Sequence, residues 1–113
     1  MSNENQIIAE GGPLAALPGS GKLLGLDLGT KTIGVAVSDA MRYSATPLET
    51  IARTKFTADA ARIVELVAVN GAAGIVLGLP LNMDGSEGPR AQSTRAFARN
   101  LASKLDIPIA FWD

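Results

Sequence analysis

The sequence contains no cysteine and no histidine. Without cysteine the chain forms no disulfide bond, no zinc–thiolate site and no thiol nucleophile. Without histidine it has no Ser-His-Asp triad, no histidine acid–base catalysis and no histidine metal ligand. Any catalysis must therefore use carboxylates, hydroxyls, amines or backbone groups.

Long apolar runs and a large charge of one sign are also missing. No stretch approaches the roughly 18 apolar residues of a membrane span, and the polar opening lacks the basic and then apolar pattern of a secretory signal. We therefore expect a cytoplasmic protein with no membrane partner. The net charge is −1, unlike that of a sequence-indifferent nucleic-acid binder. The segment 88–105 nevertheless holds four basic residues and no acidic one: Arg90, Arg95, Arg99 and Lys104.

The length of 113 residues allows one domain with a core of its own. Residues 1–21 are rich in glycine and proline and have no hydrophobic period, which predicts a flexible leader before a domain over 22–113. The segment Gly19–Lys22 lacks the earlier glycine and the following Ser or Thr of a phosphate-binding loop, so we expect no nucleotide site there.

Hydrophobic periodicity in the domain predicts two helices between short strands. The first helix is expected to be capped by Thr57 and to stop at Gly71, and the second to run from Pro89 to about Leu105. Strands are expected at 23–28, 33–38, 46–51, 74–78 and 107–112. The order β-β-β-α-β-α-β predicts an α/β fold with a five-stranded sheet of antiparallel and parallel pairs.

Asp27 is a single carboxylate between Leu26 and Leu28, in a strand whose apolar run predicts burial on both faces. A buried carboxylate is costly unless a cation meets it. A metal ion or a phosphate-bearing substrate would explain Asp27. A structural role, with a partner in Lys31 or in the turn amides, is the alternative.

The turn after Asp27 contains Gly29 and Thr30, and Gly34 follows in the next strand. Glycines let a ligand approach the backbone, and a threonine hydroxyl reaches a phosphate oxygen. Turn geometry alone would also explain these residues. The sequence Asp-x-Gly-Thr also resembles the phosphate hairpin of sugar kinases, actin and heat-shock ATPases, but those proteins close two such domains around ATP.

The segment 78–88 leaves the end of a parallel strand, where α/β sheets place ligands. For Asp84 we favour a turn with Gly85, whereas Glu87 is a candidate metal ligand or a partner of the helix dipole. If the last strand lies beside the first, Asp113 and Asp27 converge at one edge of the sheet. Such oxygen ligands suit Mg²⁺ or Mn²⁺.

Arg95 and Arg99 are four residues apart, on a helix face away from Phe97. They are candidates for binding a phosphate backbone. A solvated helix surface is the alternative.

The segments 26–39 and 76–87 resemble the YqgF/RuvX family, described as Holliday junction resolvases and as nucleases that mature the end of pre-16S ribosomal RNA. The resemblance implies an RNase H-like fold and a cytoplasmic, metal-dependent endonuclease. Asp27 matches the family's first-strand aspartate, Glu87 the acid of its loop, and Asp113 the aspartate that opens an Asp-Glu-Arg motif. Family members continue into C-terminal helices that cover the sheet, so we expect an incomplete domain whose uncovered face favours self-association, for example as a homodimer.

The leading hypothesis is an endonuclease that hydrolyses phosphodiester bonds of structured nucleic acid, either pre-rRNA or branched DNA. Asp27, Glu87 and Asp113 would be the catalytic residues and would hold Mg²⁺ or Mn²⁺. The expected substrate-binding residues are Gly29, Thr30, Lys31, Asn82, Arg95 and Arg99. The alternative is a non-catalytic module that binds nucleic acid or a partner and lacks a complete site.

Overall fold

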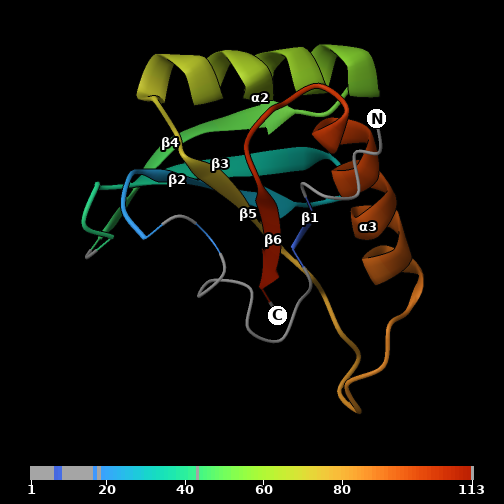
Figure 1. The fold of residues 1–113 in the computed structure, drawn as a ribbon. Coiled ribbons are helices and arrows are strands. Elements are labelled where there is room, and N and C mark those ends of the chain that lie inside the picture. The colour runs from blue at the N-terminus through green and yellow to red at the C-terminus, as the bar shows by residue number, and fades with distance from the viewer. Residues whose placement is uncertain (1–6, 9–16, 18, 43, 113) are drawn as a thin grey trace.

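The structure, a computed structural model, describes residues 7–8, 17, 19–42 and 44–112. Figure 1 shows the strands as one twisted sheet with two helices packed on it. The elements in chain order are β1 Ile7–Ile8, β2 Leu23–Leu28, β3 Thr32–Ser38, β4 Ala45–Ala52, α2 Phe56–Asn70, β5 Gly74–Gly78, α3 Pro89–Ala102 and β6 Ile109–Trp112.

The sheet has the strand order β1-β6-β5-β2-β3-β4. Strands β2, β3 and β4 form antiparallel pairs, whereas β5 is parallel to both β2 and β6. Helix α2 connects β4 to β5 and α3 connects β5 to β6. The predicted α/β fold with a mixed sheet is therefore confirmed, and its five strands are joined by the short β1 at one edge.

Two parts of the segment expected to be a flexible leader take part in the fold. Strand β1 pairs with β6 in parallel, with Ile7 opposite Ile109. Leu17 is buried, and a Cβ built on Gly74 would lie 3.2 Å from its Cδ2 atom. Most other residues of that segment lie outside the described residues.

Helix α2 begins at Phe56, with Lys55 as its N-cap, so the prediction of Thr57 as the cap was wrong. The buried Asp59 explains the earlier start, because its carboxylate accepts hydrogen bonds from the backbone N–H of Thr54, at 3.2 and 3.3 Å, and from the Thr54 hydroxyl. A carboxylate in the first turn is also favourable for the helix dipole. The helix ends at Gly71, whose φ of 62° suits glycine.

Helix α3 begins at Pro89 as predicted and ends at Ala102, three residues before the expected end. Its Phe97 ring packs edge to face against Phe56 at 5.2 Å between centroids, which joins the two helices. Within the part of the chain that the structure describes, no helix is long and apolar enough to cross a membrane.

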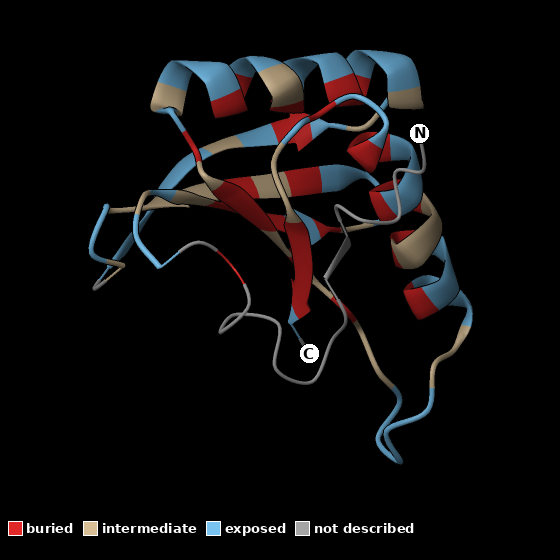
Figure 2. Ribbon diagram, in the orientation of Figure 1, coloured by how far each residue is buried: buried red, intermediate tan, exposed pale blue. Residues whose placement is uncertain are grey.

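The strands alternate between a buried face and an open face. In β2, Leu24, Leu26 and Leu28 are buried in one core with both helices, whereas Asp27 is exposed. Figure 2 shows this core between the sheet and the helices. The expectation that β2 is buried on both faces was therefore wrong, because α2 and α3 both pack against the same face of the sheet.

Candidate active site

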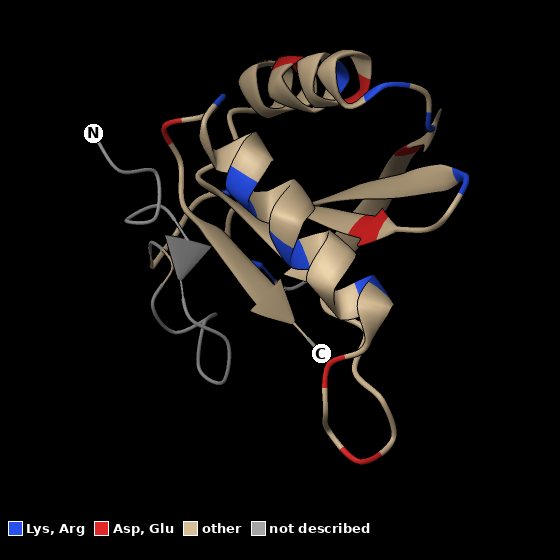
Figure 3. Ribbon diagram, turned by 90° about the vertical axis from the view of Figure 1, so that its right-hand side faces the viewer, with Lys and Arg blue, Asp and Glu red and all other residues tan. Residues whose placement is uncertain are grey.

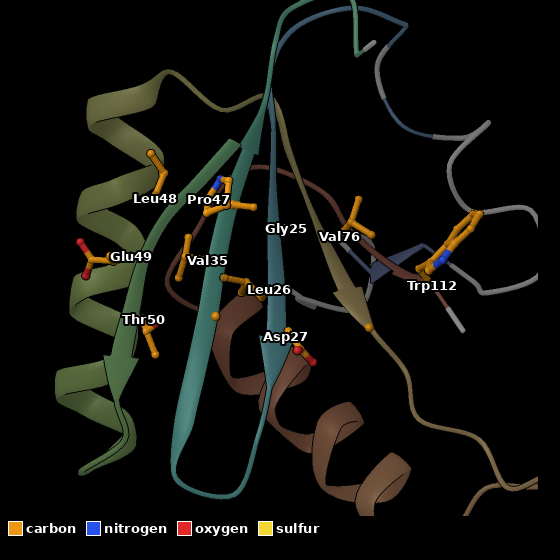
Figure 4. Close-up of a pocket in the computed structure, with 13 residues that line it drawn as sticks. Gly25, Leu26, Asp27, Val35, Pro47, Leu48, Glu49, Thr50, Val76 and Trp112 are labelled. Carbon is orange, nitrogen blue, oxygen red and sulfur yellow. The ribbon is translucent and has the colours of Figure 1, made fainter. Parts of the chain in front are cut away.

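Asp27 stands between two glycines on the open face of the sheet. It pairs with Gly34 of β3, and Gly78 of β5 pairs with Trp112 of β6. Because Leu26 pairs with Leu77 in parallel register, Gly78 is the next residue beside Asp27. The backbone is therefore bare on both sides of the Asp27 side chain, and Figure 4 shows the carboxylate in the open.

This face forms an open groove of about 530 Å³. The groove is lined by Gly25, Leu26, Asp27, Gly34, Val35, Ala36, Pro47, Leu48, Glu49, Thr50, Val76, Gly78 and Trp112. Among the described residues nothing donates a hydrogen bond to the Asp27 carboxylate or forms an ion pair with it. The alternative of a Lys31 partner is therefore not realised, and both oxygens of Asp27 face the groove as acceptors.

Glu87 is in a different environment, because Arg95 of α3 binds its carboxylate with two hydrogen bonds. Arg95 Nε donates to Oε1 at 2.7 Å and Nη2 donates to Oε2 at 2.6 Å. The guanidinium also lies over the ring of the buried Phe111, at 5.0 Å from its centroid. The pair therefore fixes the end of the loop against α3 and β6. The Arg95 guanidinium, predicted to bind substrate, already has a carboxylate partner within the chain.

The loop between β5 and α3 is organised by its own polar groups. Asp84 accepts hydrogen bonds from the hydroxyl and the backbone N–H of Ser86, and these bonds hold the pKa of the Asp84 carboxyl below its usual range. Asn82 donates from Nδ2 to the Ser86 hydroxyl at 3.1 Å, and its side chain packs against Gly88. The structure therefore gives Asp84 and Asn82 contacts that shape the loop.

The turn between β2 and β3 is closed by a hydrogen bond from Gly29 N to Thr32 O at 2.8 Å. Thr30 and Lys31 at its tip are exposed. Two arginines reach this turn from other elements: Arg53 follows β4, and Arg90 is in the first turn of α3. Along α3, Figure 3 shows basic positions and no acidic one.

Among the described residues no three acidic side chains group around one point, and the described members of the predicted metal-binding set are Asp27 and Glu87. Asp113 lies outside the described residues. Strand β5 lies between β6 and β2, so the condition for Asp113 and Asp27 to converge, a last strand directly beside the first, is not met. Trp112 nevertheless shares the row of Asp27. Asp27 itself fits a Mg²⁺ or Mn²⁺ ligand, because these ions prefer carboxylate oxygens open to water and substrate.

The sequence did not predict three features of the site. The pair of Glu87 and Arg95 left no sign in the sequence, because the two residues are eight positions apart and Glu87 precedes the helix. Arg53 and Trp112 left none, because their places depend on the pairing of strands that are distant in the chain.

Comparisons with known proteins bear on the same residues. Residues 21–113 match the RuvX family, described as Holliday junction resolvase. A protein of Cereibacter sphaeroides is 72% identical over 100 residues, which are 88% of this chain and 62% of the relative. A protein of Rhodopseudomonas palustris is 70% identical over 96 residues, which are 85% of this chain and 60% of the relative. Both are named "Putative pre-16S rRNA nuclease".

The structure of Thermus thermophilus RuvC in complex with a Holliday junction substrate superimposes with a TM-score of 0.58 at 13% identity, over 80% of this chain and 63% of that one. This likeness confirms the RNase H-like fold. The chain spans about three fifths of the length of the curated relatives it matches. The family match over most of the domain, together with this fold, shows that the chain belongs to the RuvX family.

Proposed function

We propose that the site around Asp27 belongs to a metal-dependent endonuclease that cleaves phosphodiester bonds of structured nucleic acid. The observation that carries the proposal is the Asp27 carboxylate, which is open to the groove between Gly34 and Gly78 and has no partner in the described chain. Membership of a nuclease family supports the same reaction.

Asp27 would hold a divalent cation, with Glu87 and Asp113 as the further proposed ligands. When bound, Mg²⁺ or Mn²⁺ supplies an activated water and offsets charge on the phosphate oxygens.

Gly34 and Gly78 leave the backbone bare, so that a nucleic-acid strand approaches Asp27 closely. Arg95 holds the Glu87 carboxylate in one orientation, while Lys31 and the exposed Arg99 are proposed to bind the phosphate backbone.

The test is cleavage of labelled four-way DNA junctions and of pre-16S RNA ends in Mn²⁺. We would compare this chain, the same chain carrying Asp27→Asn, and a version extended to the length of the relatives. Asn keeps the size of Asp27 and removes its charge, so we expect at least a hundredfold loss in cleavage rate, the scale of one essential catalytic group (~10²). Asp106→Asn, which removes an exposed carboxylate outside the groove, is the matched control.

Equal cleavage by the Asp27→Asn and Asp106→Asn variants would contradict the proposal. Cleavage of the DNA junction or of the RNA end would identify which of the two nucleic acids is the substrate.

A second candidate function is a binding module without catalysis. The observation on its side is that no three acidic side chains group around one point among the described residues. Binding without metal, together with no cleavage in Mn²⁺ by either the chain or its extended form, would select this alternative.

A further inference from the structure

A small pocket beside the β2–β3 turn shares no lining residue with the groove of Asp27. It is lined by Leu28, Gly29, Thr30, Arg53, Arg90, Ser93, Thr94 and Phe97 and has a volume of about 70 Å³. One water molecule takes about 30 Å³ of liquid, so the pocket has room for one compact polar group.

Two arginines from different elements are anchored on adjacent carbonyl groups of this turn. Arg53 donates from Nη1 to Gly29 O at 2.6 Å, and Arg90 donates from Nη2 to Leu28 O at 3.3 Å. The Arg53 guanidinium also lies over the Phe97 ring, at 5.7 Å from its centroid. Both guanidinium groups are therefore held at the pocket in the absence of any ligand.

Neither Arg53 nor Arg90 forms an ion pair with a carboxylate in the described chain. Two guanidinium groups that line one small pocket repel each other. An anion between them would remove this repulsion. The planar N–H fork of arginine matches the paired oxygens of a phosphate group.

Hydroxyl groups complete the lining. The Thr94 hydroxyl already has a partner, because its Oγ1 donates a hydrogen bond to Arg90 O at 3.0 Å. The side chains of Ser93 and Thr30 are exposed at the pocket, and no hydrogen bond within the described chain engages their hydroxyls. The pocket thus presents two cations and two free hydroxyl donors, and no acidic residue lines it.

We infer that this pocket binds one phosphate group of a nucleic-acid strand, through Arg53 and Arg90 with Thr30 and Ser93. The inference rests on the proposed function for the nature of the ligand. Gly29 is two residues beyond Asp27, a separation of about 7 Å at 3.3 Å per residue. A phosphate held there would fix the register of the strand relative to Asp27, so the pocket sets which bond reaches the catalytic carboxylate.

The first experiment measures binding of a fluorescently labelled four-way junction in EDTA over a range of salt concentrations. The double variant Arg53→Gln with Arg90→Gln is compared with Lys22→Gln and Lys104→Gln, which remove the same charge from exposed positions outside the pocket. Loss of one phosphate contact lowers the slope of log K against log salt by about 0.9. We expect this change, and several-fold weaker binding, only in the arginine variant.

A second variant avoids the hydrogen bonds that the arginines make to the turn. Ser93→Asp places a carboxylate at the mouth of the pocket from an exposed helix position, and Ser93→Asn is its neutral isostere. We expect Ser93→Asp to lower the slope more than Ser93→Asn does, because both variants remove the Ser93 hydroxyl and only Ser93→Asp adds a negative charge. Equal slopes for Ser93→Asp and Ser93→Asn would overturn the inference even if the arginine variants fail to fold.

A titration with inorganic phosphate, followed by NMR shifts of the Gly29, Thr30 and Ser93 amides, separates the possible sources of the anion. Shifts at these amides together with the salt effect support a nucleic-acid phosphate. Shifts without junction binding would overturn the nucleic-acid ligand and assign a free anion. No shift and no salt effect would overturn the site. Because EDTA prevents metal-dependent cleavage, failure of the proposed nuclease activity leaves this result readable.

Discussion

Asp27 and Glu87 are both acidic, but their carboxylates differ in the partners that they have. The Asp27 carboxylate has no partner in the described chain, whereas both oxygens of Glu87 accept hydrogen bonds from Arg95. A carboxylate that accepts two hydrogen bonds from a half-buried arginine has one favoured orientation. The Asp27 carboxylate is therefore open to the groove, whereas the Glu87 carboxylate is held in a fixed place at the end of its loop.

The first prediction concerns the arginine that holds Glu87. Replacing Arg95 with Gln removes both hydrogen bonds and the contact with Phe111. A partly buried ion pair with two hydrogen bonds contributes about 1–2 kcal/mol, so amide hydrogen exchange in residues 82–88 should accelerate about 5- to 30-fold.

Arg95→Lys keeps the charge and should recover part of the protection. The control is Arg99→Gln, on the same helix and exposed. Equal exchange in the Arg95→Gln and Arg99→Gln variants would show that the ion pair does not order the loop.

Among the elements, α2 depends on a contact that lies just before its first turn. Asp59 is 4% exposed and accepts hydrogen bonds only from Thr54 among the contacts of the described chain. This contact connects the end of β4 to the helix, so it fixes the direction in which the chain enters α2. The entry in turn brings Phe56 against Phe97 and joins α2 to α3.

The second prediction is that Asp59→Ala lowers the free energy of unfolding by about 1–3 kcal/mol, because the Thr54 N–H loses a charged acceptor. Urea unfolding followed by circular dichroism measures the change. Asp106→Ala removes an exposed carboxylate and should change stability by less than about 0.5 kcal/mol. A loss as small as that control in the Asp59→Ala variant would refute the role of this contact.

The elements over residues 22–113 were predictable, because local patterns determine them, whereas β1 was not. The short apolar runs of β2 and β5 and the proline that opens α3 suffice to place these elements almost to the residue. The start of α2 was misplaced, because Thr57 has the residue type of a cap whereas Asp59 makes the contact. Asp27 could be singled out from the sequence. The exposure of its strand could not, since that depends on both helices packing against one face.

At the scale of the whole molecule, the groove of Asp27 is an apolar surface in a chain of net charge −1. Trp112 is 56% exposed and Leu48 is 37% exposed on this face. The floor between them is mostly apolar and carries the exposed Asp27 carboxylate, while Arg53 and Arg90 lie at the β2–β3 turn. Two guanidinium groups thus lie at the turn that follows Asp27, even though the whole chain has a net charge of −1.

The third prediction follows from this exposed floor. A hydrophobic fluorescent dye should bind the groove, because apolar surface leaves water favourably at roughly 25 cal/mol per Å². Val76→Glu places a charge in the middle of the floor and should reduce dye fluorescence by at least half. It should also shift size-exclusion elution toward the monomer if the same floor drives self-association.

Val69→Glu is the control, because Val69 is 77% exposed on α2 and outside the groove. Since both variants change the net charge equally, only a difference between them locates the dye and the self-association on the face that carries Asp27. Equal fluorescence and elution in the two variants would place both properties elsewhere on the molecule.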